Sequence, residues 1–348
     1  MNEHPHHADS HTHDHDPGRE TRQGVGARLA HLFRPHSHDH AESIDSALTA
    51  SEEGMRALKI SLVGLGVTAL AQVVIYAMSG SVALLADTIH NFSDALTAVP
   101  LAIAFVLARR APTRRYTYGY GRAEDLAGLF IVAMIALSAV VALWQSAGRL
   151  VDPEPIDAVG WVLAAGVVGF VGNELVASYR IRVGRRIGSA ALVADGLHAR
   201  TDGLTSLAVV GAAIGSAMGA PILDPVIGIG IGLAILGVLR RAARDIYRRL
   251  MDSVDPELPD QIEAGLAAHP EVRSVDRVRV RWIGHELHAD AEVTVDAGLS
   301  VAAGHDILER ARHELLHGIH RLADVHLHAN PSAVDGVDAH GLTRHHFP

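Results

Sequence analysis

Two stretches of the chain repeat one pattern: ADTIHNFSDALT at residues 86–97 and ADGLHARTDGLT at residues 194–205. Both lie in apolar segments long enough to cross a bilayer, where a charged side chain costs at least a few kcal/mol. In each copy the first acid, the histidine and the second acid stand at i, i+3 and i+7, so a helix presents all three on one face. Two such faces brought together offer two imidazoles and two carboxylates, which suit one tetrahedral divalent ion. The predicted metal ligands are His90, Asp94, His198 and Asp202.

The composition limits the classes of protein to which the chain can belong. It has 348 residues, 30 of them basic and 39 acidic, and the formal charge of −9 argues against a nucleic-acid partner. It contains 24 histidines and no cysteine, so it has neither disulfides nor thiolate ligands. We therefore expect bound metal to be held by imidazole and carboxylate groups, and we expect no cofactor.

Changes in hydropathy divide the chain into parts. Residues 1–52 are rich in histidine and poor in apolar residues, so we predict a disordered tail that binds transition metals loosely. Residues 53–250 hold six apolar segments, each near the roughly 20 residues that a helix needs to span hydrocarbon. Because lipid offers no partner to free backbone groups, these segments should form an all-α bundle of six transmembrane helices. They are residues 60–78, 81–107, 126–148, 158–179, 190–216 and 222–239.

Beyond the last apolar segment the pattern becomes that of a small soluble domain. Helical and alternating apolar patterns follow in the order α-β-β-α-β, which predicts a ferredoxin-like α+β domain over residues 251–331. Its small core would gain from pairing with a second copy. Residues 332–348 should form a second disordered tail. The expected elements are a helix at 256–268, strands at 272–282 and 286–295, a helix at 300–317 and a strand at 323–329.

Charged residues other than the predicted ligands indicate how the segments are oriented in the membrane. Alternate loops carry clusters of arginine, whereas the loops between them carry almost only Arg149. Under the positive-inside rule the arginine-rich loops and both termini lie in the cytoplasm, as in a multi-pass protein of the inner cell membrane. The second and fifth segments are then antiparallel, with the predicted ligands near the middle of the bilayer. Glu174 and Arg200, also within the bundle, are expected to neutralise one another.

Further polar residues lie next to the predicted ligands. Asp87 is about one helical turn toward the outside, and Asp195 is about one turn toward the cytoplasm. We hypothesise that these two acids are relay ligands on the two sides of the site; the alternative is that each hydrogen-bonds a neighbouring helix. Asn91 and Asn173 are candidates for donors that orient the ligand carboxylates, with ordinary interhelical hydrogen bonds as the alternative.

Histidines of the soluble domain offer a second group of candidate metal ligands. His326 and His328 share one strand face by their i,i+2 spacing, and His288 and His305 are candidates to join them in a regulatory site. The alternative is that all four are ordinary surface histidines. The sequence HELLH at 313–317 matches a zinc-protease pattern, but the apolar side of its helix leaves the motif facing solvent without a closed pocket. We interpret the match to a protease as chance, with a surface metal site at His313 and His317 as the alternative.

The combination of six spans, paired HxxxD motifs and a small α+β domain resembles the cation diffusion facilitator family. The resemblance runs from about Leu58 to Pro331. It implies a homodimeric exporter that exchanges cytoplasmic Zn2+ or a similar divalent ion for protons by alternating access, with the four predicted ligands as the transport site. The most specific pieces are LLADTIHNFSD (84–94), YGYGRAEDLAG (118–128), ADGLHARTD (194–202) and ADVHLHANP (323–331).

The resemblance also assigns residues outside the transport site. Arg122 and Asp252 match positions that form a charge interlock between subunits in relatives. His305 and His328 match positions of ligands in the cytoplasmic domain. These assignments are implied by the motif positions alone.

The chain departs from some members of the family at two places. Tyr116 and Tyr120 stand where some relatives have histidines of an additional metal site, so we predict no such site here. Asn330 stands where some relatives have a carboxylate ligand in the soluble domain. The second departure leaves the composition of a cytoplasmic site open.

The ligand types leave alternative functions open. Two imidazoles and two carboxylates suit Zn2+ and also allow an exporter selective for Mn2+, Co2+, Fe2+ or Cd2+. The alternative of a different class is an intramembrane zinc-dependent enzyme. Catalytic zinc usually has three protein ligands and an open position for water, whereas four ligands close the shell. We therefore expect a transporter of metal ions and not an enzyme.

Overall fold

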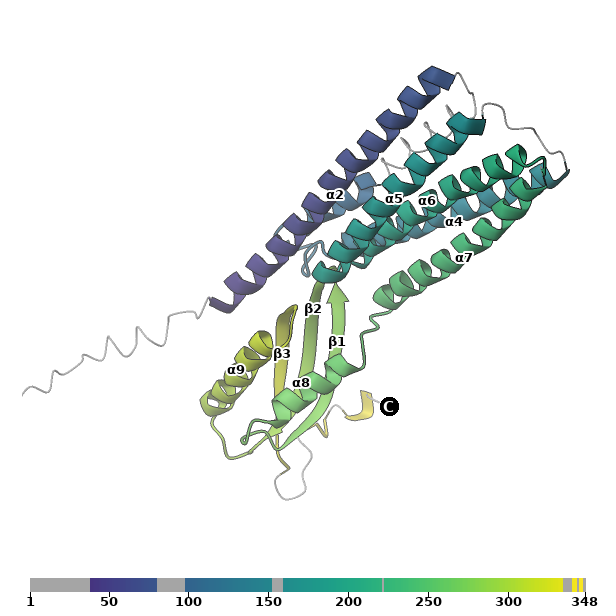
Figure 1. Ribbon diagram of the computed structural model, residues 1–348. Coiled ribbons are helices and arrows are strands. Elements are labelled where there is room, and N and C mark those ends of the chain that lie inside the picture. Colours follow the sequence, from purple (N-terminus) through teal and green to yellow (C-terminus); the bar gives the residue numbers. More distant parts are fainter. Residues whose placement is uncertain are drawn as a thin grey trace, which may run out of the picture. The chain divides into compact units, whose positions relative to one another are not determined.

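The computed structural model describes residues 38–79, 98–151, 159–220, 222–333, 340–342 and 344–346. Long helices form the first part of this chain, and a mixed domain of helices and strands forms the rest (Figure 1). The elements are α2 (His38–Ser79), the helical segment Ala98–Ala108, α4 (Arg122–Val151), α5 (Val159–Ile187), α6 (Ala190–Ala217), α7 (Leu223–Leu250), α8 (Glu257–Ala267), β1 (Ser274–Ile283), β2 (Glu286–Val295), α9 (Val301–Gly318), β3 (Leu322–Pro331) and the short 3-10 helix η1 (Arg344–His346).

Four of the helices in the described ranges are long and apolar enough to cross a membrane. They are Thr49–Met78 within α2, and α4, α5 and α7. Each contains most or all of one predicted segment. Helix α6, with 28 residues, is long enough but is not one of these four, and the second copy of the repeated pattern places charged residues in it. The predicted segment 81–107 is described only from residue 98, and the helix found there spans Ala98–Ala108.

These helices expose apolar side chains and bury polar ones. Leu70, Trp144 and Leu175 are 64%, 80% and 68% exposed. By contrast, Gln72 in α2 and Asn173 in α5 are only 1% and 3% exposed. A water-soluble bundle would place its large apolar groups inside. The observed distribution fits a helical domain surrounded by lipid, with its functional groups in the interior.

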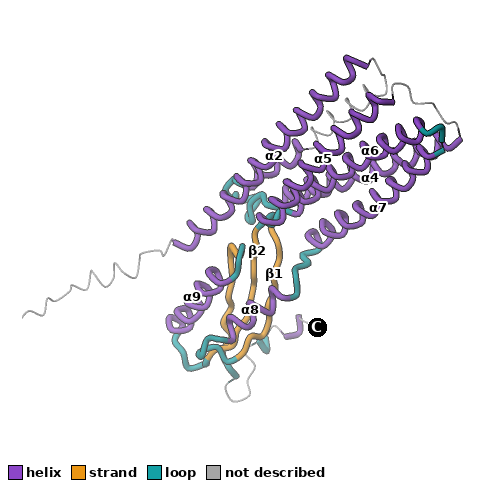
Figure 2. Tube along the Cα trace, viewed as in Figure 1, coloured by secondary structure: helices purple, strands orange, loops and turns teal. Residues whose placement is uncertain are grey.

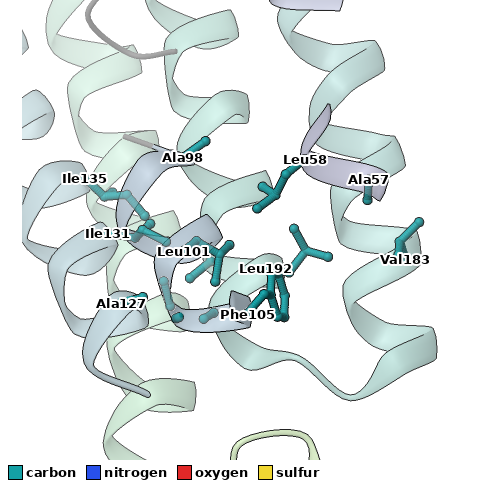
Figure 3. Packing of buried hydrophobic residues seen from close by; sticks show 14 of the residues in the cluster. Ala57, Leu58, Ala98, Leu101, Phe105, Ala127, Ile131, Ile135, Val183 and Leu192 are labelled. Carbon is teal, nitrogen blue, oxygen red and sulfur yellow. The ribbon is translucent and has the colours of Figure 1, made fainter. Parts of the chain in front are cut away.

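Apolar side chains fill the core of the bundle toward one end of the helices. Figure 3 shows Leu101 and Phe105, from the segment before α4, among side chains of the neighbouring helices. Ile131 and Ile135 of α4 and Leu192 of α6 belong to the same cluster, and all five side chains are fully buried. Burial of such side chains stabilises a fold by about 1.5–3 kcal/mol each in water, and by close packing where lipid surrounds the protein.

Helices α5 and α6 approach one another closely because glycine lies at their contact. A Cβ atom at Gly196 in α6 would lie only 3.0 Å from the backbone nitrogen of Ile181 in α5. Small residues permit this approach between membrane helices. The connecting turn contains Gly188 at φ +76°, followed by Ser189, whose hydroxyl accepts a 3.0 Å hydrogen bond from the Leu192 backbone N–H. Both features fix the register of α5 against α6.

The C-terminal domain is a three-stranded sheet covered on one face by two helices. Strands β1 and β2 are antiparallel, β2 and β3 are parallel, and α9 makes the connection that a parallel pair requires (Figure 2). Ile262 and Leu266 of α8 share a core with Ala311 and Leu315 of α9 and with alternate residues of the strands. The predicted order α-β-β-α-β is confirmed, with β2 spanning the predicted residues.

Candidate metal-transport site

The α6 half of the predicted ligand set is buried inside the bundle. The side chains of His198 and Asp202 are 2% and 3% exposed, and His198 Nδ1 lies 3.7 Å from Asp202 Oδ1. One helical turn separates them, as the repeated pattern requires. Four other residues predicted at this site lie outside the described residues; they are Asp87, His90, Asn91 and Asp94.

A complete metal site needs ligands from more than α6. Within the parts of the chain that the structure describes, no three His, Asp or Glu side chains are grouped closely enough to hold a metal ion. The missing ligands of the predicted set all belong to residues 80–97. The set of four ligands therefore stays a prediction.

Asn173 of α5 lies beside the α6 ligands. Its side chain is 3% exposed, and its Cβ is 3.4 Å from the position that a Cβ would take at Gly203, the residue after Asp202. Among the described residues, nothing accepts a hydrogen bond from Asn173 Nδ2. Because a buried amide without a partner costs free energy, this N–H group is available to a ligand carboxylate or to water. Its predicted role as an orienting donor stays a prediction.

Asp195 is paired with Arg180, a residue of α5 that the sequence analysis did not single out. Arg180 Nη1 lies 2.9 Å from Asp195 Oδ2, and the two side chains are 2% and 0% exposed. Two further nitrogens of the guanidinium, Nε and Nη2, have no hydrogen-bond partner among the residues that the structure describes. In sequence Arg180 belongs to an arginine-rich stretch that resembles a loop. The signal for its burial is its spacing, because it stands seven residues after Asn173 and so shares the same helix face.

Glu174 and Arg200 form the ion pair that was predicted for them. Arg200 Nε donates to Glu174 Oε2 at 3.0 Å, and Arg200 Nη2 donates to Oε1 at 2.6 Å. Ser178 donates a further hydrogen bond of 3.0 Å to Glu174 Oε1. The prediction is confirmed, and the pair uses the two-point geometry that holds an arginine most firmly to a carboxylate.

Arg122 and Asp252 meet within a single chain. Arg122 Nη2 lies 2.5 Å from Asp252 Oδ1, and the same arginine donates to the Arg249 carbonyl oxygen at 3.3 Å. Asp252 follows α7 in the left-handed region at φ +53°, a conformation that aspartate tolerates better than most residues. The role of these residues between subunits stays a prediction.

A second polar contact, which the sequence analysis missed, joins α4 to the turn between β1 and β2. His285 Nδ1 lies 3.0 Å from Glu124 Oε2, with the side chains 5% and 2% exposed. Arg249 Nη1 donates to the Gly284 carbonyl oxygen in the same turn at 2.5 Å. Gly284 has φ +63°, which glycine adopts without strain. Spacing within one element does not reveal such a pair, because its members are 161 residues apart.

The four candidate histidines of the C-terminal domain fall on two faces of it. His288, His326 and His328 alternate with the buried residues of β2 and β3, so they lie on the face of the sheet away from the helices. His305 belongs to α9, which covers the other face. His328 stands opposite Glu292 in the β2–β3 register. The structure therefore groups three candidates on one face and separates the fourth from them.

Asp276 anchors a polar cluster at one end of the sheet. Its carboxylate accepts hydrogen bonds from Thr294 Oγ1 at 2.7 Å, Ser274 Oγ at 2.8 Å and Asn330 Nδ2 at 3.3 Å. Burial alone would raise the pKa of Asp276, but these donors outweigh it and hold the pKa below its ordinary value. His340 Nε2 lies 2.9 Å from Asn330 Oδ1. Asn330 thus acts here as a donor to a carboxylate.

The HELLH motif lies on the outer side of α9. Glu314 is 68% exposed, and its Oε2 lies 3.4 Å from Nε2 of His269. The rings of His313 and His317 are 4.4 Å apart. The predicted exposure of the motif is confirmed for Glu314.

Comparisons with known proteins agree with this architecture. The family model of the cation efflux transmembrane domain matches residues 58–251, and that of the cation efflux protein cytoplasmic domain matches residues 254–332. A probable cation efflux system protein of Mycobacterium tuberculosis is 59% identical over 92% of this chain and 96% of its own length. The manganese efflux system protein MneP of Bacillus subtilis is 26% identical over 81% and 98% of the two chains. The magnetosome protein MamB of Magnetospira sp. is 26% identical over 73% and 87%. The chain therefore belongs to the cation efflux family, which consists of membrane transporters and not of enzymes.

Proposed function

We propose that the protein exports a divalent transition-metal ion from the cytoplasm in exchange for protons. Zn2+ is the first candidate for this ion. The observation that carries this proposal is the buried pair of His198 and Asp202 in α6 of a cation efflux protein. Imidazole and carboxylate are ligands of such ions, and burying them is costly without a cation. His90 and Asp94 complete the set from the first copy of the pattern.

Coupling to protons follows from the chemistry of these ligands. A metal ion binds neutral imidazole and ionised carboxylate, so protons and metal compete for the same atoms. A site loaded with metal on the cytoplasmic side releases it on the other side when protons take the ligand atoms. Histidine supplies this competition close to neutral pH.

The neighbouring acids and amides extend the site along the helices. We assign Asp87 and Asp195 as relay ligands on the outer and cytoplasmic sides of the four ligands. Asn91 and Asn173 orient the ligand carboxylates through their amide N–H groups. The unpartnered Nδ2 of Asn173, among the described atoms, supports this assignment.

The proposed assembly is a homodimer in the inner cell membrane with both termini in the cytoplasm. The arginine-rich loops support this orientation. The match of the C-terminal domain to the cytoplasmic domain of cation efflux proteins supports its position and its part in pairing. Arg122 and Asp252 link the subunits in this assembly, and the candidate histidines of the sheet bind metal for regulation.

Mn2+ is the second candidate for the exported ion. A relative that matches most of this chain is named a manganese efflux system protein. The proposed ligands include two carboxylates and no thiolate, a set that Mn2+ accepts as well as Zn2+ does. A direct comparison of the two ions in one transport assay decides between them.

The test is metal uptake by the full chain reconstituted into vesicles across a pH gradient. We expect the gradient to drive accumulation of Zn2+ in the wild type and Asp202→Ala to abolish it. Asp306→Ala, the same substitution at an exposed position of α9, is the matched control and should transport normally. Wild-type vesicles that fail to accumulate Zn2+ or Mn2+ would contradict the proposal. Accumulation unaffected by the gradient would contradict proton exchange.

A further inference from the structure

We propose that Arg180 is a tethered competitor of the transported ion, which holds the Asp195 carboxylate between transport events and yields it when a metal ion arrives. The inference rests on the proposed function and adds to it a residue that acts on the path of the ion. It begins from the ion pair itself, which is 2.9 Å long and completely buried at Asp195.

The pair is poorly satisfied for a structural contact. A guanidinium has five N–H donors in a fixed fork, yet Nε and Nη2 of Arg180 find no acceptor in the described part of the chain. Neither oxygen of Asp195 accepts a well-aligned hydrogen bond there. A buried ion pair is favourable only when its geometry is excellent and the remaining donors and acceptors are satisfied. Among the described residues, Arg180 and Asp195 meet neither condition.

The second arginine of the same two helices shows what a structural pair looks like. Arg200 binds Glu174 through two nitrogens at 3.0 and 2.6 Å, and Ser178 donates to the same carboxylate. That pair has more contacts although its side chains are 36% exposed and those of Arg180 and Asp195 are almost inaccessible. The weaker contact therefore lies where an unsatisfied group costs most.

The position of the pair explains why the protein has a contact with this energetic cost. Asp195 stands three residues before His198 on α6, about 4.5 Å along the axis, and on the same face. Asn173, whose Nδ2 has no acceptor among the described residues, stands two turns from Arg180 on the facing side of α5. The poorly satisfied polar atoms thus follow the line of the predicted ligands toward the turn that joins α5 and α6. An ion that travels along this line meets the Asp195 carboxylate.

A guanidinium suits this position because it keeps its charge. Because it is not deprotonated near neutral pH, Arg180 can compete for the Asp195 carboxylate at every stage of the transport cycle. Among the described residues, Arg180 reaches Asp195 through Nη1 alone, which makes the exchange less costly than breaking a fork would be. When the metal ion has bound the carboxylate, the positive charge of Arg180 remains beside the ion and favours its dissociation. Arg180 therefore lowers the affinity at this level and raises the rate of passage.

The experiment compares Zn2+ uptake and Zn2+ binding by the full chain in the wild type, Arg180→Met, Asp195→Asn and the double variant. In Arg180→Met we expect KM and the maximal rate each to fall about tenfold, because the freed carboxylate retains the ion. This variant should bind one more Zn2+ per chain than the wild type. Zn2+ bound by the histidine-rich tails is the same in both proteins and cancels in that difference. The double variant should lose the additional ion. Arg180→Lys retains the cation and should bind the wild-type number of ions.

Arg200→Met is the matched control, because it removes the arginine of the structural pair. It should lower the amount of folded protein and leave KM unchanged. The inference is overturned if Arg180→Met and Asp195→Asn lower the folded amount, the double variant restores it, and KM and the number of bound ions stay at wild-type values throughout. Wild-type vesicles without uptake would contradict the proposed function alone, since the binding comparison would still decide the role of Arg180.

Discussion

Asp195 in α6 and Asp276 in β1 are both acids with assigned partners, yet the protein satisfies them to very different degrees. Asp276 lies near solvent and accepts hydrogen bonds from three side chains, Thr294, Ser274 and Asn330. Asp195 is completely buried, where the need for partners is greatest, and its one polar contact among the described residues is to Arg180. The arrangement is the reverse of what stability alone would favour.

The difference separates two uses of one residue type. A carboxylate surrounded by donors is fixed and contributes to the domain that holds it. A carboxylate that is buried with few partners stays ready for a cation, and the rest of the fold must supply the free energy that keeps it there. In this protein the first kind lies in the C-terminal sheet and the second lies between the membrane helices.

The strongest test of the comparison is the same substitution in both regions. Asp202→Asn should lower metal transport by roughly 100-fold or more, because an amide oxygen is a much weaker ligand than a carboxylate. Asp276→Asn should leave the transport rate near that of the wild type. Initial rates of Zn2+ uptake into vesicles, at equal amounts of protein, provide the measurement. Equal losses in the two variants would remove the distinction between the two regions.

Glu174 sharpens the comparison because it is an acid within the bundle that is well paired. Glu174→Leu should destabilise the folded protein by about 2–3 kcal/mol, since it leaves the charge of Arg200 without a partner in the membrane. Adding Arg200→Leu should recover most of that loss. Thermal unfolding in detergent measures both steps. A double variant as unstable as the single one would mean that the pair has no role in balancing charge.

Gly196 tests whether close contact between α5 and α6 keeps the buried acid in place. Gly196→Val should cost about 1–3 kcal/mol, because its side chain would be forced against the backbone of α5. Gly237→Val is the control, since a Cβ at Gly237 meets no atom within 4 Å in the described structure. The midpoint of thermal unfolding should fall for the first variant only. Similar midpoints for both would argue against tight packing at this contact.

The smallest expected effect is the pH dependence of the Asp276 cluster. Because hydrogen bonds lower its pKa in the folded state, its contribution is complete above the ordinary aspartate pKa of about 3.9 and is lost as the pH falls through the folded value. Solvent screening keeps this contribution below about 1 kcal/mol. The difference between the wild type and Asp276→Asn in hydrogen exchange of the β1 amides should be larger at pH 5 than at pH 3. A difference that grew on acidification would contradict the assignment.

Periodicity in the sequence was sufficient to predict most of the fold. Alternation of apolar residues located β2 at its observed bounds, and the i,i+3,i+7 pattern placed Asp195, His198 and Asp202 on a buried face of α6. The pairing of Glu174 with Arg200 was also predictable, because two opposite charges in the membrane need each other. These features are set either by the pattern within a single helix or strand or by the high free-energy cost of an unpaired charge in the membrane.

Contacts between elements were harder to predict. Arg180 lies close to Arg182 and Arg185, which resemble the end of a membrane span, so its burial against Asp195 has no signal beyond a shared helix face with Asn173. The separation of His305 from the strand histidines depends on which face of the sheet α9 covers. The two-residue period of a strand and the 3.6-residue period of a helix describe each element by itself and do not determine that choice.

The contact between the β1–β2 turn and the helices limits how the chain can be shortened. A protein ending after α7 would lose His285, the imidazole beside the Glu124 carboxylate, and the Gly284 carbonyl oxygen that accepts from Arg249. Glu124 would then lose its imidazole partner, whereas Arg249 would keep its contact with the Gly188 carbonyl oxygen and its attraction to the Glu124 and Asp125 carboxylates. Truncated versions of the membrane half would therefore lack two polar contacts that hold the start of α4 and the end of α7.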